Sequence, residues 1–389
     1  MIKELEALPP MDRSKWKRVR FGDVVRCVDK TCRDPQAEGL TRVVGLEHLD
    51  PGELKITRWA DVADGTSFTR TFRAGQVLFG KRRAYQRKAA VADFDGICSG
   101  DILVFEADSS RFSPALLPFV IASSSFFDHA IGTSAGSLSP RTKWKELAEY
   151  EFLVPSFADQ HRIAALLWSI EDCRYKVAQA IASLAMVRKL ILLSKFRGHS
   201  YKSVPLGDVF EVQLGKMLSP KARQVADQYP YLTNTNIQWG HLDLHDVRTM
   251  HFDERERDKF KLQKGDLLVC EGGEVGRAAI WNGELADCYY QKALHRLRPR
   301  SDCYLNEFLR ELLKFFAQSG DLSKLTGHST IAHLTAEKLR QLRIPNVPVA
   351  EQAEIVRVIT LLDNQSQQLE DHTDYLQRVR GAILSWVCG

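Results

Sequence analysis

The chain has 389 residues, of which 44% are hydrophobic and 26% charged, and this composition predicts a folded protein of two or three domains. Its apolar runs are shorter than the roughly 20 residues that cross a bilayer, so no membrane span is expected. Its eight cysteines form no C-x-x-C pair, so neither a disulfide framework nor a zinc site is expected. We expect a cytoplasmic location. The net charge of +5 is too small to indicate a nucleic-acid partner by itself.

The first globular part is expected to span residues 1–155. Short runs rich in β-branched and aromatic residues, separated by Gly and Asp, predict strands at 76–80, 89–94 and 101–107. A longer apolar pattern predicts a helix at 117–131. The pattern as a whole favours a mainly β core with a few short helices.

Two polar segments of this part are candidate DNA contacts. Cations beside a ring and an amide suit phosphates and base edges, although a solvated hairpin explains the first segment nearly as well. Its candidates are Lys81, Arg82, Arg83, Tyr85, Gln86, Arg87 and Lys88. In the second segment, just before the long helix, the candidates are Ser137, Arg141 and Lys143. Hydroxyl groups there are also explained by a capped loop that enters a short helix.

A long helix is expected at 156–198, where Ser156 and Asp159 form an S-x-x-D capping box. Apolar residues recur every seven positions on one narrow stripe, which is typical of a coiled coil. The predicted seam consists of Ile163, Ile170, Val177, Leu184 and Ile191. A stripe of about 38 residues extends roughly 57 Å and needs an equally long partner.

The second globular part, residues 199–347, echoes the first. RFGDVV at 20–25 returns as PLGDVF at 205–210, strands are predicted at 266–271, 277–281 and 294–299, and a helix at 306–320. The Gly-rich stretch 271–276 lies between two strand patterns and is interpreted as a turn. Candidate DNA contacts here are Asn234, Asn236, Gln238, Arg277, Tyr290, Gln291, Lys292, His328, Ser329 and Thr330.

A second long helix is expected at 348–389, and it repeats the first. AEQAEIVRVI at 350–359 follows ADQHRIAALL at 158–167 at an offset of 192 residues. Its seam residues, at the same offset, are Ile355, Leu362, Leu369, Leu376 and Ile383. The sequence therefore predicts an α+β protein with a pseudo-two-fold internal repeat. Two similar mainly β domains are joined by two long helices that pair as an antiparallel coiled coil.

Signatures of catalysis are missing from the sequence. It has no G-x-x-x-x-G-K-[ST] loop for nucleotide phosphates, no N-P-P-Y or D-P-P-F motif of adenine methyltransferases, and no spaced set of metal ligands. Acidic pairs such as Asp371 with Asp374 fall on the predicted helix, where a solvated face is the simpler interpretation. We therefore expect a non-catalytic chain without a metal or cofactor of its own.

The architecture resembles the specificity subunit of type I restriction-modification systems. VPSFADQHRIAALL at 154–167, IPNVPVAEQAEIVRVITLLD at 344–363 and the repeated GDV at 22–24 and 207–209 carry this resemblance. It implies that each globular part is a target recognition domain that reads one half of an asymmetric, bipartite sequence in double-stranded DNA. The helices would space the two half-sites and dock two methyltransferase subunits.

The resemblance also implies where the chemistry of the complex resides. The methyltransferase subunits would bind S-adenosylmethionine and methylate adenine, and two restriction subunits, where present, would use ATP and Mg²⁺ for cleavage. Two other functions remain open from the residues alone. One is a stand-alone nuclease, and the other is a coiled-coil scaffold that binds proteins rather than DNA.

Overall fold

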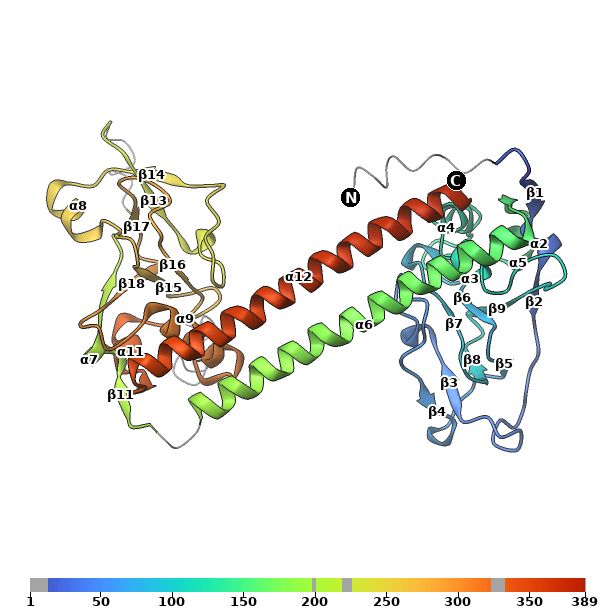
Figure 1. Ribbon diagram of the computed structural model, residues 1–389, viewed down its shortest axis with the longest axis horizontal. Helices are drawn as coiled ribbons and strands as arrows, with labels where there is room; N and C mark the ends of the chain where they lie inside the picture. Colours follow the sequence, from blue (N-terminus) through green and yellow to red (C-terminus); the bar gives the residue numbers. More distant parts are fainter. Residues whose placement is uncertain (1–12, 198–200, 219–225, 323–332, 389) are drawn as a thin grey trace. The chain divides into compact units, whose positions relative to one another are not determined.

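The computed structural model describes residues 13–197, 201–218, 226–322 and 333–388 (Figure 1). Contacts divide the chain into unit 1, residues 1–180 with 369–389, and unit 2, residues 181–368. Each unit contains one globular body and part of each of two 40-residue helices, α6 (Phe157–Phe196) and α12 (Val349–Cys388). The division into four sequence segments stays a prediction.

Unit 1 is built from three antiparallel or mixed sheets. A two-stranded sheet pairs β1 (Lys17–Arg20) with β10 (Glu151–Val154), which leads into α6. The first four-stranded sheet has the order β2 (Val25–Val28), β9 (Ile102–Ala107), β6 (Val77–Gly80), β7 (Ala89–Val91). The second has the order β4 (Ala60–Asp61), β3 (Arg42–Val44), β8 (Gly96–Cys98), β5 (Arg70–Phe72), with β3 and β8 parallel. The helices of the body are α2 (Phe21–Val24), α3 (Leu117–Ile121), α4 (Ser124–Gly132) and α5 (Trp144–Ala148).

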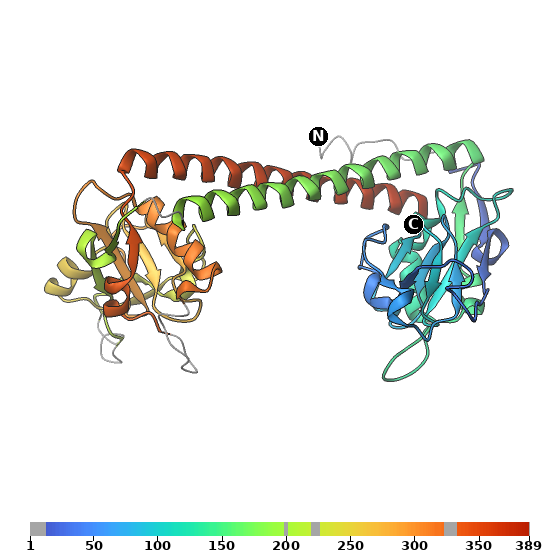
Figure 2. The ribbon, with the colours of Figure 1, turned by 90° about the horizontal axis from the view of Figure 1, so that it is seen from below.

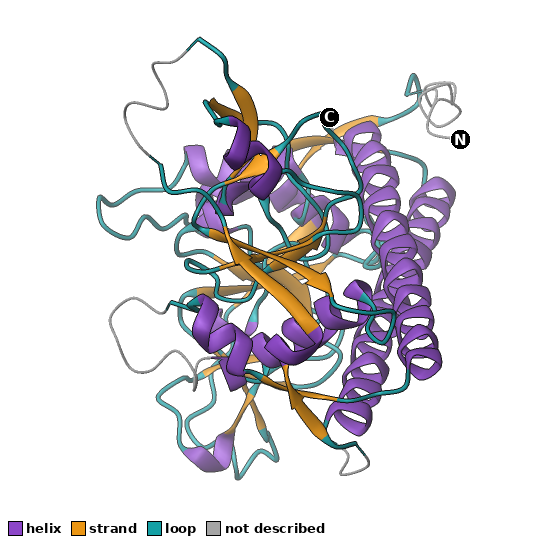
Figure 3. Ribbon diagram, turned by 90° about the vertical axis from the view of Figure 1, so that its left-hand side faces the viewer, coloured by secondary structure: helices purple, strands orange, loops and turns teal. Residues whose placement is uncertain are grey.

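Unit 2 repeats this plan. β11 (Ser203–Pro205) pairs with β19 (Arg343–Pro345), which leads into α12. A four-stranded sheet has the order β12 (Phe210–Leu214), β18 (Leu294–Pro299), β15 (Leu267–Cys270), β16 (Ala278–Ile280), and a three-stranded sheet has the order β14 (Arg248–Met250), β13 (Tyr229–Leu232), β17 (Tyr289–Tyr290). The helices of the body are α7 (Leu206–Val209), α8 (Glu254–Phe260), α9 (Asn306–Gln318) and α11 (Ala336–Gln341). In Figure 3 the long helices lie on one side of the sheets of this unit.

The predicted fold class is confirmed, with one local difference. The segment 117–131 is two helices, α3 and α4, instead of one. Ser123 separates them, because its Oγ accepts a hydrogen bond from the backbone N–H of Phe126 at 3.2 Å and so caps the start of α4. A side-chain cap of this kind ends one helix and starts another within a continuous apolar pattern.

A buried glutamine fastens the start of each long helix to the body that precedes it. Gln160 is 2% exposed; its Oε1 accepts from Ser113 N at 2.8 Å and its Nε2 donates to Pro155 O at 3.1 Å. Gln352 is fully buried; its Oε1 accepts from Leu305 N at 2.9 Å and its Nε2 donates to Val347 O at 2.7 Å. All three positions recur at the 192-residue offset, so the A-[DE]-Q motif marks a junction between body and helix.

The two long helices pack against each other in antiparallel directions within each unit (Figures 1 and 2). In unit 1, Ile163 and Ile170 of α6 share one hydrophobic core with Leu376 and Ile383 of α12. In unit 2, Leu192 of α6 shares a core with residues of α12 that include Ile355 and Ile359. This pairing is the one that the seam predicted.

Seam positions differ in how deeply they are buried. Six of the ten predicted seam side chains are buried, namely Ile163, Ile170, Val177, Ile355, Leu376 and Ile383. The remaining four, Leu184, Ile191, Leu362 and Leu369, are only half-buried. Leu192 is buried instead of Ile191, because a straight α-helix drifts about 20° per heptad and the buried position has moved by one residue at the fifth repeat.

In each unit an arginine forms an ion pair between the two long helices, at positions related by the same offset. In unit 1, Arg380 Nε lies 2.5 Å from Glu171 Oε1, and both side chains are largely buried. In unit 2, Arg188 Nε lies 3.0 Å from Asp363 Oδ1, and its Nη2 also reaches Glu311 of α9 at 2.5 Å. A buried arginine needs such partners, so these pairs restrict the register of the two helices.

The surface of α6 is unusually apolar for a helix of a folded body. By length and composition it can also cross a membrane, since one 18-residue window has a mean hydropathy of 1.6 and only 11% of that window is buried. Met186, Val187 and Leu190 are among the exposed side chains. One such helix is a weak indication of a membrane span, and both ends of α6 are built into hydrophobic cores. The expectation of no membrane span, drawn from uninterrupted apolar runs, did not anticipate this exposed surface.

Candidate nucleic-acid interface

The basic turn of unit 1 joins β6 to β7 and is held in one shape. Arg83 and Arg87 both have left-handed backbones, with φ of 55° and 52°, and they flank a short 3-10 turn, Ala84–Gln86. Ala84 is buried and fixes the turn to the core, whereas Tyr85 is 54% exposed. The ring of Tyr85 is therefore presented to solvent from a turn with little freedom to move.

The cations of this turn are largely engaged by other parts of unit 1. Lys88 Nζ donates to Leu46 O at 2.7 Å, so this side chain supports the loop that contains Leu46. Arg87 pairs with Asp128 of α4 at 3.0 Å and also donates to Ser124 Oγ. We infer that both residues shape the turn, and that their remaining N–H groups are what a phosphate can reach.

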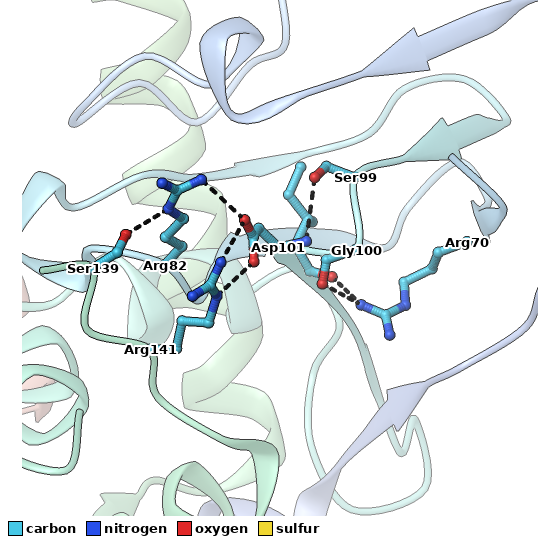
Figure 4. A network of polar contacts seen from close by, with 8 residues as sticks. Arg70, Arg82, Ser99, Gly100, Asp101, Ser139 and Arg141 are labelled. Atoms are coloured by element: carbon cyan, nitrogen blue, oxygen red, sulfur yellow. Dashed lines mark hydrogen bonds and ion pairs between the residues drawn. The ribbon is translucent and has the colours of Figure 1, made fainter. Parts of the chain in front are cut away.

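Asp101 organises the second half of the site (Figure 4). It lies just before β9, and it binds two arginines from separate segments. Arg141 Nε is 2.8 Å from Asp101 Oδ1, and Arg82 Nη1 is 3.5 Å from Oδ2. The hydrogen bond and the charge of Arg141 lower the pKa of the Asp101 carboxyl. Two cations on one carboxylate leave a net positive cluster whose guanidinium groups are oriented before any ligand binds.

The two predicted segments of unit 1 therefore meet in space. Arg82 also donates through Nε to Ser139 Oγ at 2.6 Å, and Arg83 N donates to Pro140 O at 2.7 Å. Ser137 and Lys143, on either side of this contact, are exposed. The turn at 81–88 and the loop before α5 form one basic surface, as the sequence alone had not established.

Several candidates of unit 2 prove to be structural. Asn236 is 2% exposed and all its hydrogen-bonding groups are used: Oδ1 accepts from Thr233 N, and Nδ2 donates to the carbonyl oxygens of Asp243 and Asp246, both at 2.9 Å. Tyr290 is fully buried, and burial raises the pKa of its hydroxyl above its ordinary range. We leave both residues out of the interface, because neither can reach a base edge from the core.

Gln291 is also buried, and its backbone packs closely against Gly215. A Cβ on Gly215 would lie 2.4 Å from Gln291 O, so the two chains approach closely only because residue 215 is glycine. Lys216 N then donates to Tyr290 O, and Lys292 N to Lys216 O. The side chain of Lys292 itself is exposed at this crossing. Of the predicted stretch 290–292, only Lys292 remains a candidate contact.

The other candidates of unit 2 lie around one short turn, Asn234–Asn236. Asn234 and Gln238 are half-buried, and the Nε2 of Gln238 donates to Thr235 O at 3.1 Å. Arg277 donates to Asn234 O at 2.7 Å and pairs with Glu274, so its guanidinium helps to fix the backbone of this turn. His328, Ser329 and Thr330 lie outside the described residues.

Sequence reasoning missed Asp101, which nothing in its neighbourhood distinguishes. It precedes a strand, as many turn aspartates do, and it stands 19 and 40 positions from its two arginines. The pairing of β6 with β9 and the backbone contacts of the loop before α5 with residues 81–83 bring these residues together. Leu138 was also missed, and its 91% exposure has no signal in the local pattern.

Metal and thiol chemistry find no support in the described part of the chain. Over those residues no group of three or more His, Cys, Asp or Glu side chains is arranged to hold a metal ion. The seven cysteines whose side chains the structure describes are all free, and four of them are buried. Desolvation raises the pKa of Cys98 and of Cys288 to about 12, so these thiols stay protonated at neutral pH.

Two α+β units that share a four-stranded sheet of the same order and equivalent helix junctions, but differ in their polar loops, define a class of duplicated protein. Residues 199–374 match the type I restriction modification DNA specificity domain. The chain is 26% identical over 202 residues to the EcoDI specificity subunit of Escherichia coli, and this match covers 50% of the chain and 44% of the relative. It is 23% identical over 308 residues to the EcoKI specificity subunit of E. coli strain K12, covering 69% of the chain and 64% of the relative.

Solved structures agree on the fold. The S subunit of a type I restriction-modification system from M. genitalium is similar with a TM-score of 0.63 at 14% identity, over 98% of both chains. A chain from a study of complex assembly in a type I R-M system is similar with a TM-score of 0.58 at 22% identity, over 97% of both chains. The domain match and the two E. coli relatives confirm the resemblance to type I specificity subunits that the sequence motifs indicated, and the solved structures share the fold.

Proposed function

We propose that this chain recognises DNA sequence for a type I restriction-modification complex. Unit 1 reads one half-site and unit 2 reads the other. The observation that carries this proposal is a shared framework with divergent loops. The two units repeat the strand order of one four-stranded sheet and the same buried glutamine junction, while the turn at 81–88 carries five cations and its counterpart at 271–277 carries one. A shared frame with different reading loops suits an asymmetric target.

Contacts to DNA divide by chemistry within each unit. Phosphates are met by exposed or half-buried cations, which give affinity without sequence preference. We assign this role to Lys81, Arg82, Arg141, Lys143 and Lys292. Bases are read by rings and amides on restrained turns, and we assign this role to Tyr85, Gln86, Asn234 and Gln238.

The paired helices set the separation of the half-sites and dock the catalytic partners. Each helix is continuous for 40 residues, and α6 exposes apolar side chains along its surface. We propose that two methyltransferase subunits bind there and supply S-adenosylmethionine and adenine methylation. Restriction subunits, where they exist, supply ATP-dependent cleavage with Mg²⁺. This chain contributes the recognition of the target, in the cytoplasm, and no catalytic group.

The test begins with the target. Host DNA is mapped for methylated adenines with and without this chain, and the mapped sequence is built into a short duplex. The complex with the methyltransferase subunits should bind that duplex roughly 10³-fold or more tightly than a random duplex. Equal affinity for the two duplexes would refute the proposal.

A salt titration separates DNA recognition from a protein scaffold. If phosphates are neutralised, the logarithm of the binding constant falls steeply and linearly with the logarithm of salt concentration. A flat response would favour the scaffold.

A substitution tests whether each unit recognises its own half-site. Tyr85→Ala should alter discrimination at one half-site only. An equal effect at both half-sites would contradict the assignment of one half-site to each unit.

A further inference from the structure

Leu138 is the most exposed large hydrophobic side chain among the described residues, at 91%. It stands at the tip of the loop 133–143, which connects α4 to α5 in unit 1. Gly136 turns the chain sharply just before it, with φ of 115°. Ser137 and Ser139 flank it, so the leucine is an isolated apolar group on a polar loop rather than part of an apolar patch.

The base of this loop is firmly held. Ala135 and Arg141 exchange two backbone hydrogen bonds, both of 3.0 Å, which close the intervening five residues into a narrow loop. Pro140 lies inside it and limits its backbone freedom. The contacts of Ser139 and Pro140 with the 82–83 turn, described above, attach the same loop to β6. A restrained tip loses little conformational entropy when it enters a ligand.

The surroundings of the loop favour a polyanion over a protein partner. Residues 81–83, 101 and 133–143 contribute five cations and one carboxylate. That carboxylate, Asp101, is already shared by Arg82 and Arg141. By contrast, three exposed apolar residues of α6, Met186, Val187 and Leu190, fall within five positions of one another, as a protein-binding surface requires. A lone leucine at the tip of a loop whose base carries cations matches the apolar wedges with which DNA-binding proteins open base steps.

We propose that Leu138 inserts between base pairs of the half-site read by unit 1, while Arg82 and Arg141 bind the phosphates on either side. This inference rests on the proposed function and adds a residue that determines specificity. Because leucine makes no hydrogen bonds, it selects sequence through the ease of unstacking. The half-site of unit 1 should therefore contain a flexible pyrimidine–purine step, TA or CA/TG, at the position that Leu138 enters.

The experiment uses the full chain in complex with its methyltransferase subunits and the duplex taken from the methylation map. 2-Aminopurine replaces adenine at successive positions of the unit 1 half-site, because its fluorescence rises when a base is unstacked. Wild type should give a rise at one step. Leu138→Ala should abolish that rise and weaken specific binding by roughly 10- to 100-fold, the worth of burying a leucine side chain. Leu138→Phe should retain both.

The matched control is Ile131→Ala, which truncates another exposed aliphatic residue of the same unit. It should leave the affinity and the fluorescence within about twofold of wild type. Unchanged binding and fluorescence in Leu138→Ala would overturn the inference. Weaker assembly with the methyltransferase subunits at unchanged DNA binding would also overturn it, and would make Leu138 a protein contact. If wild type itself fails to discriminate the mapped duplex, the proposed function fails instead.

Discussion

Replacing Gln352 by leucine removes the polar link between α12 and the body of unit 2 while keeping the volume of the side chain similar. The amide of Gln352 makes three hydrogen bonds, to Leu305 N, Val347 O and Cys303 O. Each buried group that loses its partner costs about 1–3 kcal/mol, and Cys303 is exposed enough for water to replace its bond. Two groups therefore remain unsatisfied, and we expect a loss of about 3 kcal/mol.

Calorimetry of the isolated chain measures this loss. For a body of this size about 1 kcal/mol lowers the melting temperature by roughly 2–4 °C, so the transition of unit 2 should fall by roughly 6 to 12 °C while that of unit 1 stays in place. The control is Gln377→Leu, which changes an exposed glutamine on the same helix and should shift neither transition by more than about 0.5 kcal/mol. If the unit 2 transition has the same melting temperature in both variants, the glutamine of the A-[DE]-Q motif does not stabilise the junction between helix and body.

Three further outcomes test other parts of the structure. Glu171→Gln should lower the free energy of unfolding of unit 1 by about 3 kcal/mol in urea, because Glu171 is 6% exposed beside Arg380. Asp363→Asn at the equivalent position of unit 2, where the side chain is 45% exposed, should cost about 1 kcal/mol or less. Equal losses would contradict the burial argument. Burial lowers the pKa of His295 to about 4, so its contribution to stability is present above pH 6.5 and is lost as the pH falls toward 4. Unit 2 should lose about 3 kcal/mol of unfolding free energy over that range. If a His295→Gln variant loses as much over the same range, this histidine is not the cause. Asp101→Asn should free Arg82 and Arg141, strengthen binding to random duplexes and steepen its salt dependence, and an unchanged salt slope would place both arginines away from phosphates.

Some features of this protein follow from the order of its residues alone. The 192-residue duplication, the capping of α6 by Ser156 and the apolar seam are local or periodic patterns, and short-range geometry is enough to interpret them. The strands near 76–80 and 294–299 were predictable for the same reason. The repeat indicated a duplicated architecture, and the class of protein was indicated by the resemblance that the motifs at 154–167 and 344–363 carry.

Only the tertiary structure decided which polar side chains reach the surface. Asn236 and Tyr290 have the right chemistry for reading adenine, yet the fold places both in the core. The amide of Asn236 hydrogen-bonds to a buried loop, and the ring of Tyr290 packs in a hydrophobic cluster. Likewise, strand pairing and loop contacts join Asp101 to Arg82 and Arg141, which lie far from it in sequence. Long-range contacts of this kind depend on the whole packing of a unit, and no window of sequence contains them.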